Sequence, residues 1–213
     1  MEKINRPSLE DIPSFSKYDF DALNEKCKIG SKVWSSSDKL YDLLKHELSL
    51  LTKAHCSFCD GFPLNNTSKT TIEHYYPKSI YKEKTYEWEN LFLACDKCQS
   101  FAHSDNPFQK TLKMDEIDYF FESYFWFDAE SGEVKILENM DEQNTFNARN
   151  FLNRYGINKS PERLMARRSK YTDLIAIFKT ESRERDFEPY RFVFDSALFH
   201  ATILNSLSSE KNR

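Results

Sequence analysis

The chain of 213 residues is long enough for one well-packed domain, or for two small domains that share an interface. Its 18 phenylalanines and 11 tyrosines exclude a disordered protein, and its 4 glycines argue against a Gly-rich phosphate-binding loop. The net charge of -4 is unfavourable for a protein that binds nucleic acid without a partner, because phosphate contacts need local cations. We therefore expect either a confined active-site cleft or a partner protein.

The N-terminal residues show no apolar core flanked by basic residues, so they predict no secretory signal. No apolar run approaches the length needed to span a bilayer. We expect a soluble, cytoplasmic protein without membrane contact. In that reducing compartment, the 5 cysteines are expected to be metal ligands or free thiols rather than disulfides.

Residues 1–34 contain the helix breakers Pro7 and Pro13 and predict no definite element. Residues 35–38 offer N-cap side chains, and apolar residues then recur at helical spacing. The apolar residues in this stretch are Leu40, Leu43, Leu44, Leu48 and Leu51. Residues 70–72 and 91–94 are short runs with strand character. The sequence leaves open whether a helix follows Cys98, and Asn106-Pro107 would end such a helix.

The last hundred residues predict a hairpin and three helices. Residues 124–127 and 134–136 flank a turn that contains Gly132, and a helix is expected over about 141–154. Ser160, Pro161 and Glu162 are typical of a helix start, and a final helix is expected over about 188–207. The expected apolar side of the middle helix consists of Leu164, Tyr171, Leu174, Ile175 and Phe178. We predict an α+β, mainly helical protein with regions 1–34, 35–110 and 111–213.

Two Cys-x-x-Cys pairs, Cys56 with Cys59 and Cys95 with Cys98, predict a structural zinc site. Two thiolates at this spacing bend around one tetrahedral ion, and the second pair completes the shell. Because all four positions are cysteines, such a site would be closed rather than catalytic. The fifth cysteine, Cys27, is far from either pair in sequence and is expected to be a core residue or a free thiol.

The segment between the pairs contains a second cluster of chemical interest. Glu73 and His74 follow the first strand-like run, and Asn90 lies shortly before Cys95. Closure of the zinc site would bring Asn90 close to the strand that holds His74. A structural metal would therefore hold a chemical site in place. His46 and His200 lie in predicted helices and are expected to be structural.

The motifs Glu73-His74, Pro77-Lys78-Ser79 and Glu89-Asn90-Leu91, together with the two cysteine pairs, resemble the HNH endonucleases, or ββα-metal nucleases. The resemblance implies a zinc-stabilised ββα core, preceded by a helix and extended by a C-terminal hairpin and helices. It also implies that His74 is the general base, that Glu73 ligates a catalytic Mg2+ or Mn2+, and that Asn90 orients the base or shapes the loop. A neutral imidazole suits the first role, because its pKa lies near physiological pH.

The third position of the motif departs from the family pattern. His or Asn usually follows the second cysteine pair, whereas this chain has Gln99. His103 lies four residues later, so both side chains would share one face of a helix and point at the metal. We favour His103 as the ligand and Gln99 as an outer partner, since imidazole is the better transition-metal ligand. The basic residue that often follows the third position is also missing.

A closer similarity is to the HNH subunit of Septu-type anti-phage systems and to retron-associated HNH proteins. It rests on the segments HCSFCDG, IEHYYPKS, YEWENLFLACDKC and SDNPF, and more loosely on FWFD, GEV and NFLNRYGIN. The similarity implies a bacterial defence effector that hydrolyses nucleic acid. It also implies an ABC-type ATPase subunit as partner, sometimes with a retron reverse transcriptase and its RNA–DNA hybrid.

Basic residues outside the motif suggest weaker contacts. Arg163, Arg167 and Lys170 are spaced as a basic stripe opposite the expected apolar side of their helix. The stripe would meet nucleic acid or an acidic partner, or would simply be solvated, and Lys78 of the motif is a further candidate contact. Two alternatives stay open: the target is RNA, for example tRNA, or the chain is a zinc-stabilised adaptor with a degenerate site.

Overall fold

The computed structural model describes residues 1–64, 68–103, 108–178 and 183–210. Its α-helices are α1 (Phe20–Lys28), α2 (Lys39–Thr52), α3 (Asp96–Ala102), α4 (Glu142–Arg154), α5 (Pro161–Ile177) and α6 (Arg191–Glu210). Strands β1 (Thr70–His74) and β2 (Leu91–Cys95) form one antiparallel sheet, and β3 (Phe125–Phe127) and β4 (Val134–Ile136) form another. The protein therefore mixes helices with small sheets, which confirms the fold class at this coarse level.

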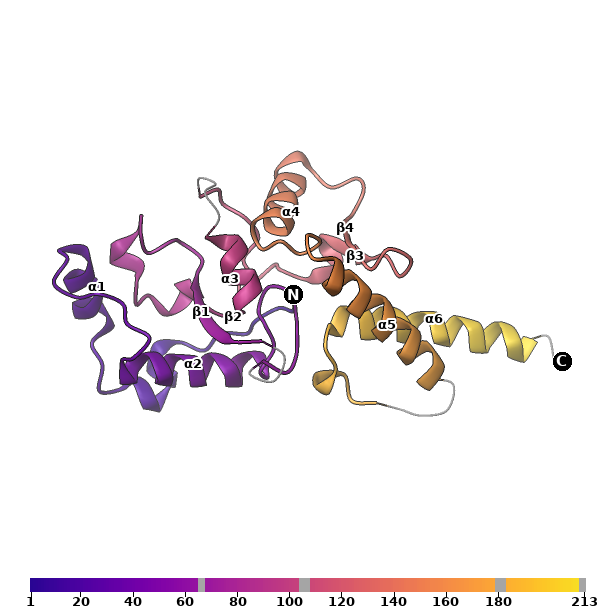
Figure 1. Ribbon diagram of the computed structural model, residues 1–213, viewed down its shortest axis with the longest axis horizontal. Coiled ribbons are helices and arrows are strands. Elements are labelled where there is room, and N and C mark those ends of the chain that lie inside the picture. Colours follow the sequence, from indigo (N-terminus) through magenta and orange to yellow (C-terminus); the bar gives the residue numbers. More distant parts are fainter. Residues whose placement is uncertain (65–67, 104–107, 179–182, 211–213) are drawn as a thin grey trace.

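The β1–β2 sheet lies at the centre of the N-terminal half, and α3 follows β2 without a loop (Figure 1). Every residue of both strands is buried, because α2 packs against β2 and α3 packs against both strands. The register pairs Glu73 with Phe92 and His74 with Leu91. Glu73 and His74 are thus the last residues of a buried strand.

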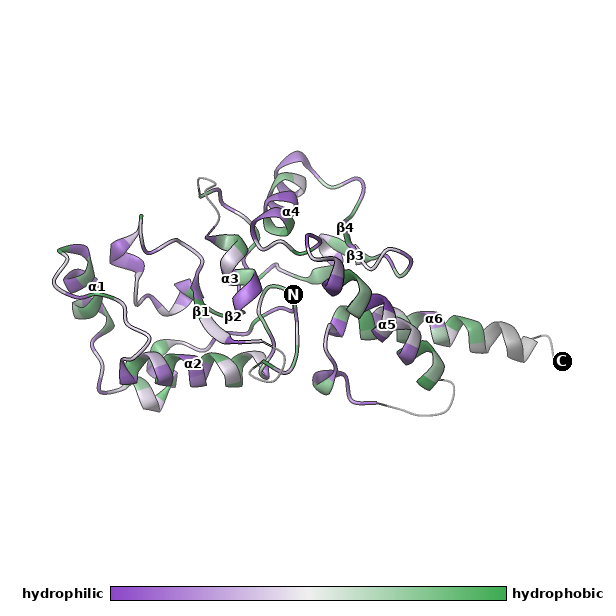
Figure 2. Cartoon of the chain, in the orientation of Figure 1, coloured by the Kyte–Doolittle hydropathy of each residue, from purple (hydrophilic) through white to green (hydrophobic). Residues whose placement is uncertain are grey.

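Local capping explains where the predicted helices begin. The Asp38 carboxylate accepts a hydrogen bond from the Leu40 amide (3.1 Å), and Ser160 caps α5 through the Arg163 amide (3.3 Å). Helix α2 buries Leu40, Leu44 and Leu48 in the core, and Figure 2 shows polar and apolar residues alternating along it. The predicted helix before the first cysteine pair is therefore confirmed.

The C-terminal half contains the predicted hairpin and helices. Strands β3 and β4 pair in the register that opposes Phe125 to Ile136, and α5 packs along α6, which projects from the body in Figure 1. The last helix begins at Arg191, later than expected, because Tyr190 has a left-handed φ of 60° that is incompatible with a helix. The expected break at Asn106-Pro107 lies outside the described residues.

The N-terminal region contains a helix for which the sequence showed no clear pattern. Helix α1 is capped by Asp19, whose carboxylate accepts from the Ala22 amide (2.9 Å). Only Phe20 and Cys27 of this helix are buried, so it carries no periodic apolar stripe to be recognised. The helix nevertheless contributes Cys27 to the wall of a pocket beside the loop after β1.

One continuous hydrophobic core includes side chains from all three predicted regions, from Met1 to Ala197. Within the described ranges, no helix combines the length and apolar character that crossing a bilayer requires.

Candidate functional site

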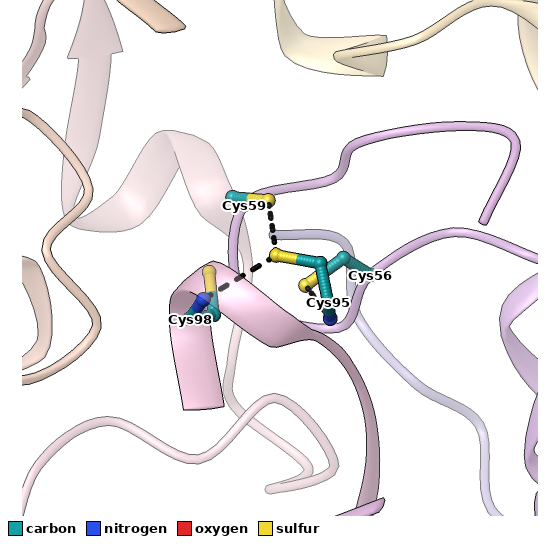
Figure 3. A group of neighbouring side chains, drawn as sticks. All are labelled: Cys56, Cys59, Cys95 and Cys98. Atoms are coloured by element: carbon teal, nitrogen blue, oxygen red, sulfur yellow. Dashed lines mark hydrogen bonds between the residues drawn. The ribbon is translucent and has the colours of Figure 1, made fainter. Parts of the chain in front are cut away.

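Four buried cysteines converge at the start of α3. The ligand atoms of Cys56, Cys59, Cys95 and Cys98 all lie within 4.8 Å of one another, and Figure 3 shows these side chains gathered around one space. Cys95 is the N-cap of α3, and its sulfur accepts from the Cys98 amide (3.4 Å). The group can hold a metal ion as predicted, and a shell of four thiolates is the donor set that structural zinc prefers.

Hydrogen bonds among the four thiols make their pKa values differ. Bonds from the neighbouring thiols hold the pKa of Cys59 well below its usual range, and the same sharing raises the pKa values of Cys95 and Cys98. A metal ion that binds all four sulfurs displaces these protons, so its affinity falls as the pH falls.

The predicted basic stripe on α5 is wrong for two of its three members. Arg163 and Arg167 are buried, with 5% and 0% exposure, and Arg163 Nη2 donates to Cys98 Sγ (3.7 Å). They share one helix face with Tyr171 and the buried Leu174, because positions 163, 167, 171 and 174 recur at helical spacing. Lys170 is ion-paired with Glu188. Arg163 thus meets the cysteine cluster, where its charge opposes that of the thiolates, whereas Arg167 donates to the Gly132 carbonyl and to Asn158 Oδ1 (both 3.4 Å).

Glu73 and His103 meet at the open end of the β1–α3 unit. His103 is the C-cap of α3, and its Nε2 lies 3.0 Å from Glu73 Oε2. The Glu73 side chain is only 2% exposed, whereas that of His103 is 59% exposed. The hydrogen bond to the carboxylate raises the pKa of His103. The pair therefore offers a buried oxygen and an accessible imidazole at one place.

Gln99 does not share this position. Its side-chain amide donates to the backbone oxygen of Ile72 (2.9 Å), which ties α3 to the middle of β1. Of the two residues left open by the sequence, His103 is the one that faces the Glu73 carboxylate.

His74 is held in one orientation by the loop that follows. Its Nε2 lies 3.0 Å from the Thr85 carbonyl oxygen, and its ring packs edge-on against Trp34 at 4.7 Å between centroids. A carbonyl only accepts hydrogen bonds, so this contact assigns the proton to Nε2 and the lone pair to Nδ1. Burial, with a smaller contribution from Lys78, lowers the pKa of His74 to about 3, so the ring is neutral at pH 7.

Asn90 shapes that loop. Its Oδ1 accepts from the Tyr76 amide (2.6 Å), and its Nδ2 donates to the carbonyl oxygens of Tyr76 (3.1 Å) and Lys84 (2.8 Å). These bonds close the segment between Tyr76 and Lys84, and the next residue is Thr85, the hydrogen-bond partner of His74. Asn90 therefore positions the imidazole indirectly, through the backbone.

Two cations lie beside the Glu73 carboxylate. Arg154, at the end of α4, places Nη2 4.0 Å from Glu73 Oε1 and donates to the Tyr75 carbonyl (3.2 Å), while its buried Nε has no hydrogen-bond partner. Lys78 has a pKa lowered by burial and opposed by the charge of Glu73. Sequence reasoning missed Arg154, because a residue so far along the chain reaches the site only through the packing of α4.

The possible ligands of a second metal are few. In the part of the chain that the structure describes, the cysteines are the only group of three or more His, Cys, Asp or Glu ligand atoms close enough to share an ion. Glu73 and His103 supply two ligands, and His74 does not join them. A cation held there would need oxygens from water or a phosphate to complete its shell, as Mg2+ commonly does.

Comparisons with known proteins assign the chain to no family. No family model matches it, and no curated protein is similar to it in sequence.

Proposed function

We propose that this protein is a metal-dependent endonuclease of the HNH class that hydrolyses phosphodiester bonds in nucleic acid. The observation that carries the proposal is the Glu73–His103 pair (3.0 Å) beside a neutral, buried His74 at the end of β1. A two-stranded antiparallel sheet followed directly by α3, with four cysteines at the junction, supports the same class.

His74 is the proposed general base. Its Nδ1 lone pair takes a proton from the attacking water, and the Thr85 carbonyl keeps Nε2 as the protonated nitrogen. In the free protein the pKa of about 3 makes His74 a weak base. A phosphate brought beside the ring raises that pKa, because a negative charge favours the protonated imidazole. The base thus becomes effective when substrate is bound.

Glu73 and His103 would hold the catalytic divalent ion, Mg2+ or Mn2+. Bound there, the ion would supply positive charge to the scissile phosphate and the leaving oxygen. Arg154 and Lys78, both beside the Glu73 carboxylate, add positive charge where the phosphate must lie. The four cysteines would hold zinc and so fix β2 and α3 against the segment that contains Cys56 and Cys59.

The test is a nuclease assay on the zinc-loaded protein with DNA and RNA substrates and added Mg2+ or Mn2+. We expect His74→Ala to lower the cleavage rate by about 10²- to 10⁴-fold, the usual contribution of a general base, while zinc content stays unchanged. His46→Ala is the matched control, because His46 is an exposed histidine on α2. Undiminished cleavage by His74→Ala would refute the proposal. The preferred nucleic acid decides between DNA and RNA as the target.

We extend the proposal to a role as the effector subunit of a bacterial anti-phage complex with an ABC-type ATPase, in some systems beside a retron reverse transcriptase. The net charge of -4 supports a partner, because a subunit held in a larger complex need not grip nucleic acid alone. Co-purification with an ATPase encoded by the neighbouring gene, followed by the same assay, tests this role. A complex that forms but cleaves neither nucleic acid with any divalent ion would favour the zinc-stabilised adaptor instead.

A further inference from the structure

A pocket of about 300 Å³ opens between the end of α1 and the loop after β1. Its apolar wall includes Cys27, Val33 and Trp34, and its lysines are Lys32, Lys78 and Lys82. None of these residues except Lys78 belongs to the motifs discussed above.

The pocket adjoins the proposed base directly. Thr85, whose carbonyl oxygen contacts His74 Nε2 at 3.0 Å, lines the pocket. The Trp34 and His74 rings meet nearly at right angles with centroids 4.7 Å apart, and Trp34 also lines the pocket. A ligand in the pocket would therefore lie next to the phosphate that His74 serves.

The charge in the pocket is unbalanced. Lys32 is neutralised by Asp38, 2.6 Å away. Within the described ranges, Lys82 enters no ion pair and no carboxylate lines the pocket, whereas Lys78 is also under the influence of the nearby Glu73 carboxylate. Burial already lowers the pKa of Lys78, so its ammonium would be stabilised by an anion.

An aromatic ring and lysine side chains together suit one kind of ligand. The Trp34 ring is partly exposed, and Lys78 Nζ lies 5.6 Å from its centroid. Single-stranded nucleic acid is bound by this combination, in which a base stacks on an aromatic side chain and neighbouring cations follow the backbone. A free phosphate would not use the apolar wall, and an apolar peptide would not use the two lysines.

We propose that this pocket binds the nucleotide next to the scissile phosphate, with its base stacked on Trp34 and its phosphates on Lys78 and Lys82. The inference rests on the proposed nuclease function and names the substrate contact that the HNH motifs do not specify. It also assigns a role to the N-terminal region, which supplies Cys27, Val33 and Trp34 to the pocket wall.

The test measures binding rather than cleavage. The full-length, zinc-loaded protein is titrated with short single-stranded DNA and RNA oligonucleotides without Mg2+ or Mn2+, and tryptophan emission is recorded. We expect quenching that Trp34→Phe removes, because the responding ring is gone, and an affinity loss of about five- to a hundredfold in Trp34→Ala, the range for one stacked base. Trp126→Phe is the matched control, since Trp126 is 44% exposed and has Lys135 Nζ 5.4 Å from its ring.

The lysines provide a second measurement that does not depend on the packing of Trp34. Lys82 is exposed, so Lys82→Ala should fold normally. We expect Lys82→Ala to weaken oligonucleotide binding and to lower the slope of log affinity against log salt by about 0.7, the value for one phosphate contact on a single strand. Lys135→Ala should leave the slope unchanged.

Three outcomes would overturn the inference. They are an unchanged affinity in both Trp34→Ala and Lys82→Ala, equal losses in Trp126→Ala and Lys135→Ala, and binding of a mononucleotide as tight as that of the strand. A failed cleavage assay on the unaltered protein with intact Trp34 quenching would count against the nuclease and leave the pocket standing. Cleavage without Trp34 quenching would count against the pocket and leave the nuclease proposal standing.

Discussion

His74 shows how burial sets the chemistry of a single residue. A histidine on an exposed strand end would titrate near pH 6.5, whereas this one, only 4% exposed, has a pKa of about 3. Its neutrality comes from desolvation, and its tautomer comes from the Thr85 carbonyl. Neither the lowered pKa nor the tautomer can be read from the dipeptide Glu73-His74 in the sequence.

The depressed pKa of His74 predicts a pH dependence of stability. The unfolded chain binds a proton at this histidine near pH 6.5, and the folded chain only near pH 3. Stability is therefore complete above pH 6.5 and is lost as the pH falls toward 3. We expect His74 to account for a loss of about 2 kcal/mol in the free energy of unfolding between pH 7 and pH 5.

Urea denaturation in excess zinc at both pH values measures this loss. His74→Gln should reduce the pH dependence by that amount, whereas His46→Gln, at an exposed position on α2, should keep it. The same pH dependence in His74→Gln and the unaltered chain would contradict the assignment. His55 adds a contribution of the same sign, because burial lowers its pKa too, but it is present in every variant compared.

At the scale of elements, strands β1 and β2 are joined by a long loop, residues 75–90, that has regular structure of its own. The segment between the strands contains two short 3-10 turns, and Asn90, the last residue before β2, hydrogen-bonds to Tyr76 at the beginning of the loop and to Lys84 farther along it. The hairpin thus carries a rigid loop instead of a tight turn. That loop presents Thr85 to His74 and Lys78 to the pocket.

Replacing Asn90 by Ala removes three hydrogen bonds and leaves the Tyr76 amide without its acceptor. We expect a loss of about 2–4 kcal/mol in the free energy of unfolding, together with a reduced cleavage rate and unchanged zinc content. Asn153→Ala, at an exposed position on α4, is the control for both measurements. A variant Asn90→Ala with full stability would show that the loop is held by other contacts.

At the scale of the whole molecule, the cysteine cluster lies where the two halves of the chain meet. Cys56 and Cys59 precede β1, Cys95 and Cys98 begin α3, and Arg163 reaches the cluster from α5. Next to the first pair, the fully buried Asp60 accepts from Arg191 Nε (3.0 Å) at the start of α6. A metal bound to the cysteines would therefore hold both halves together.

Removing the metal should loosen both halves, because Arg163, which donates to Cys98 Sγ, would lose the thiolate charge that it balances. In hydrogen exchange with and without a chelator, we expect amides of α5 and the start of α6 to lose protection along with those of β2 and α3. Cys59→Ser should reproduce this pattern, and Cys27→Ser, at the buried cysteine outside the cluster, should retain the metal. Loss of protection limited to residues 55–61 and 95–99 would contradict a shared anchor.

Features that depend on short spacing were predictable from sequence. The two cysteine pairs, the strands on either side of residues 75–90, the hairpin after residue 124 and the capped helices α2 and α5 all follow from local patterns. They are predictable because each of these patterns favours one local structure. Two ligands separated by two residues form a turn around a metal ion, and a cap followed by an apolar period of 3.6 forms a helix. The juxtaposition of Glu73 with His103 was anticipated only through the motif.

Tertiary structure decided what each cationic and aromatic side chain faces. Arg163 and Arg167 had the spacing of a surface stripe, yet both are buried. Arg163 donates to Cys98 Sγ, where the charge of the cysteine cluster compensates the cost of burying it, whereas Arg167 donates to the Gly132 carbonyl and to Asn158 Oδ1. Arg154 reaches Glu73 from α4, and Trp34 reaches His74 from a region without a readable pattern. By itself, the sequence determined which residues could do chemistry. Contacts between segments distant in the chain, which no local period encodes, determined their neighbours, their protonation and the pocket beside them.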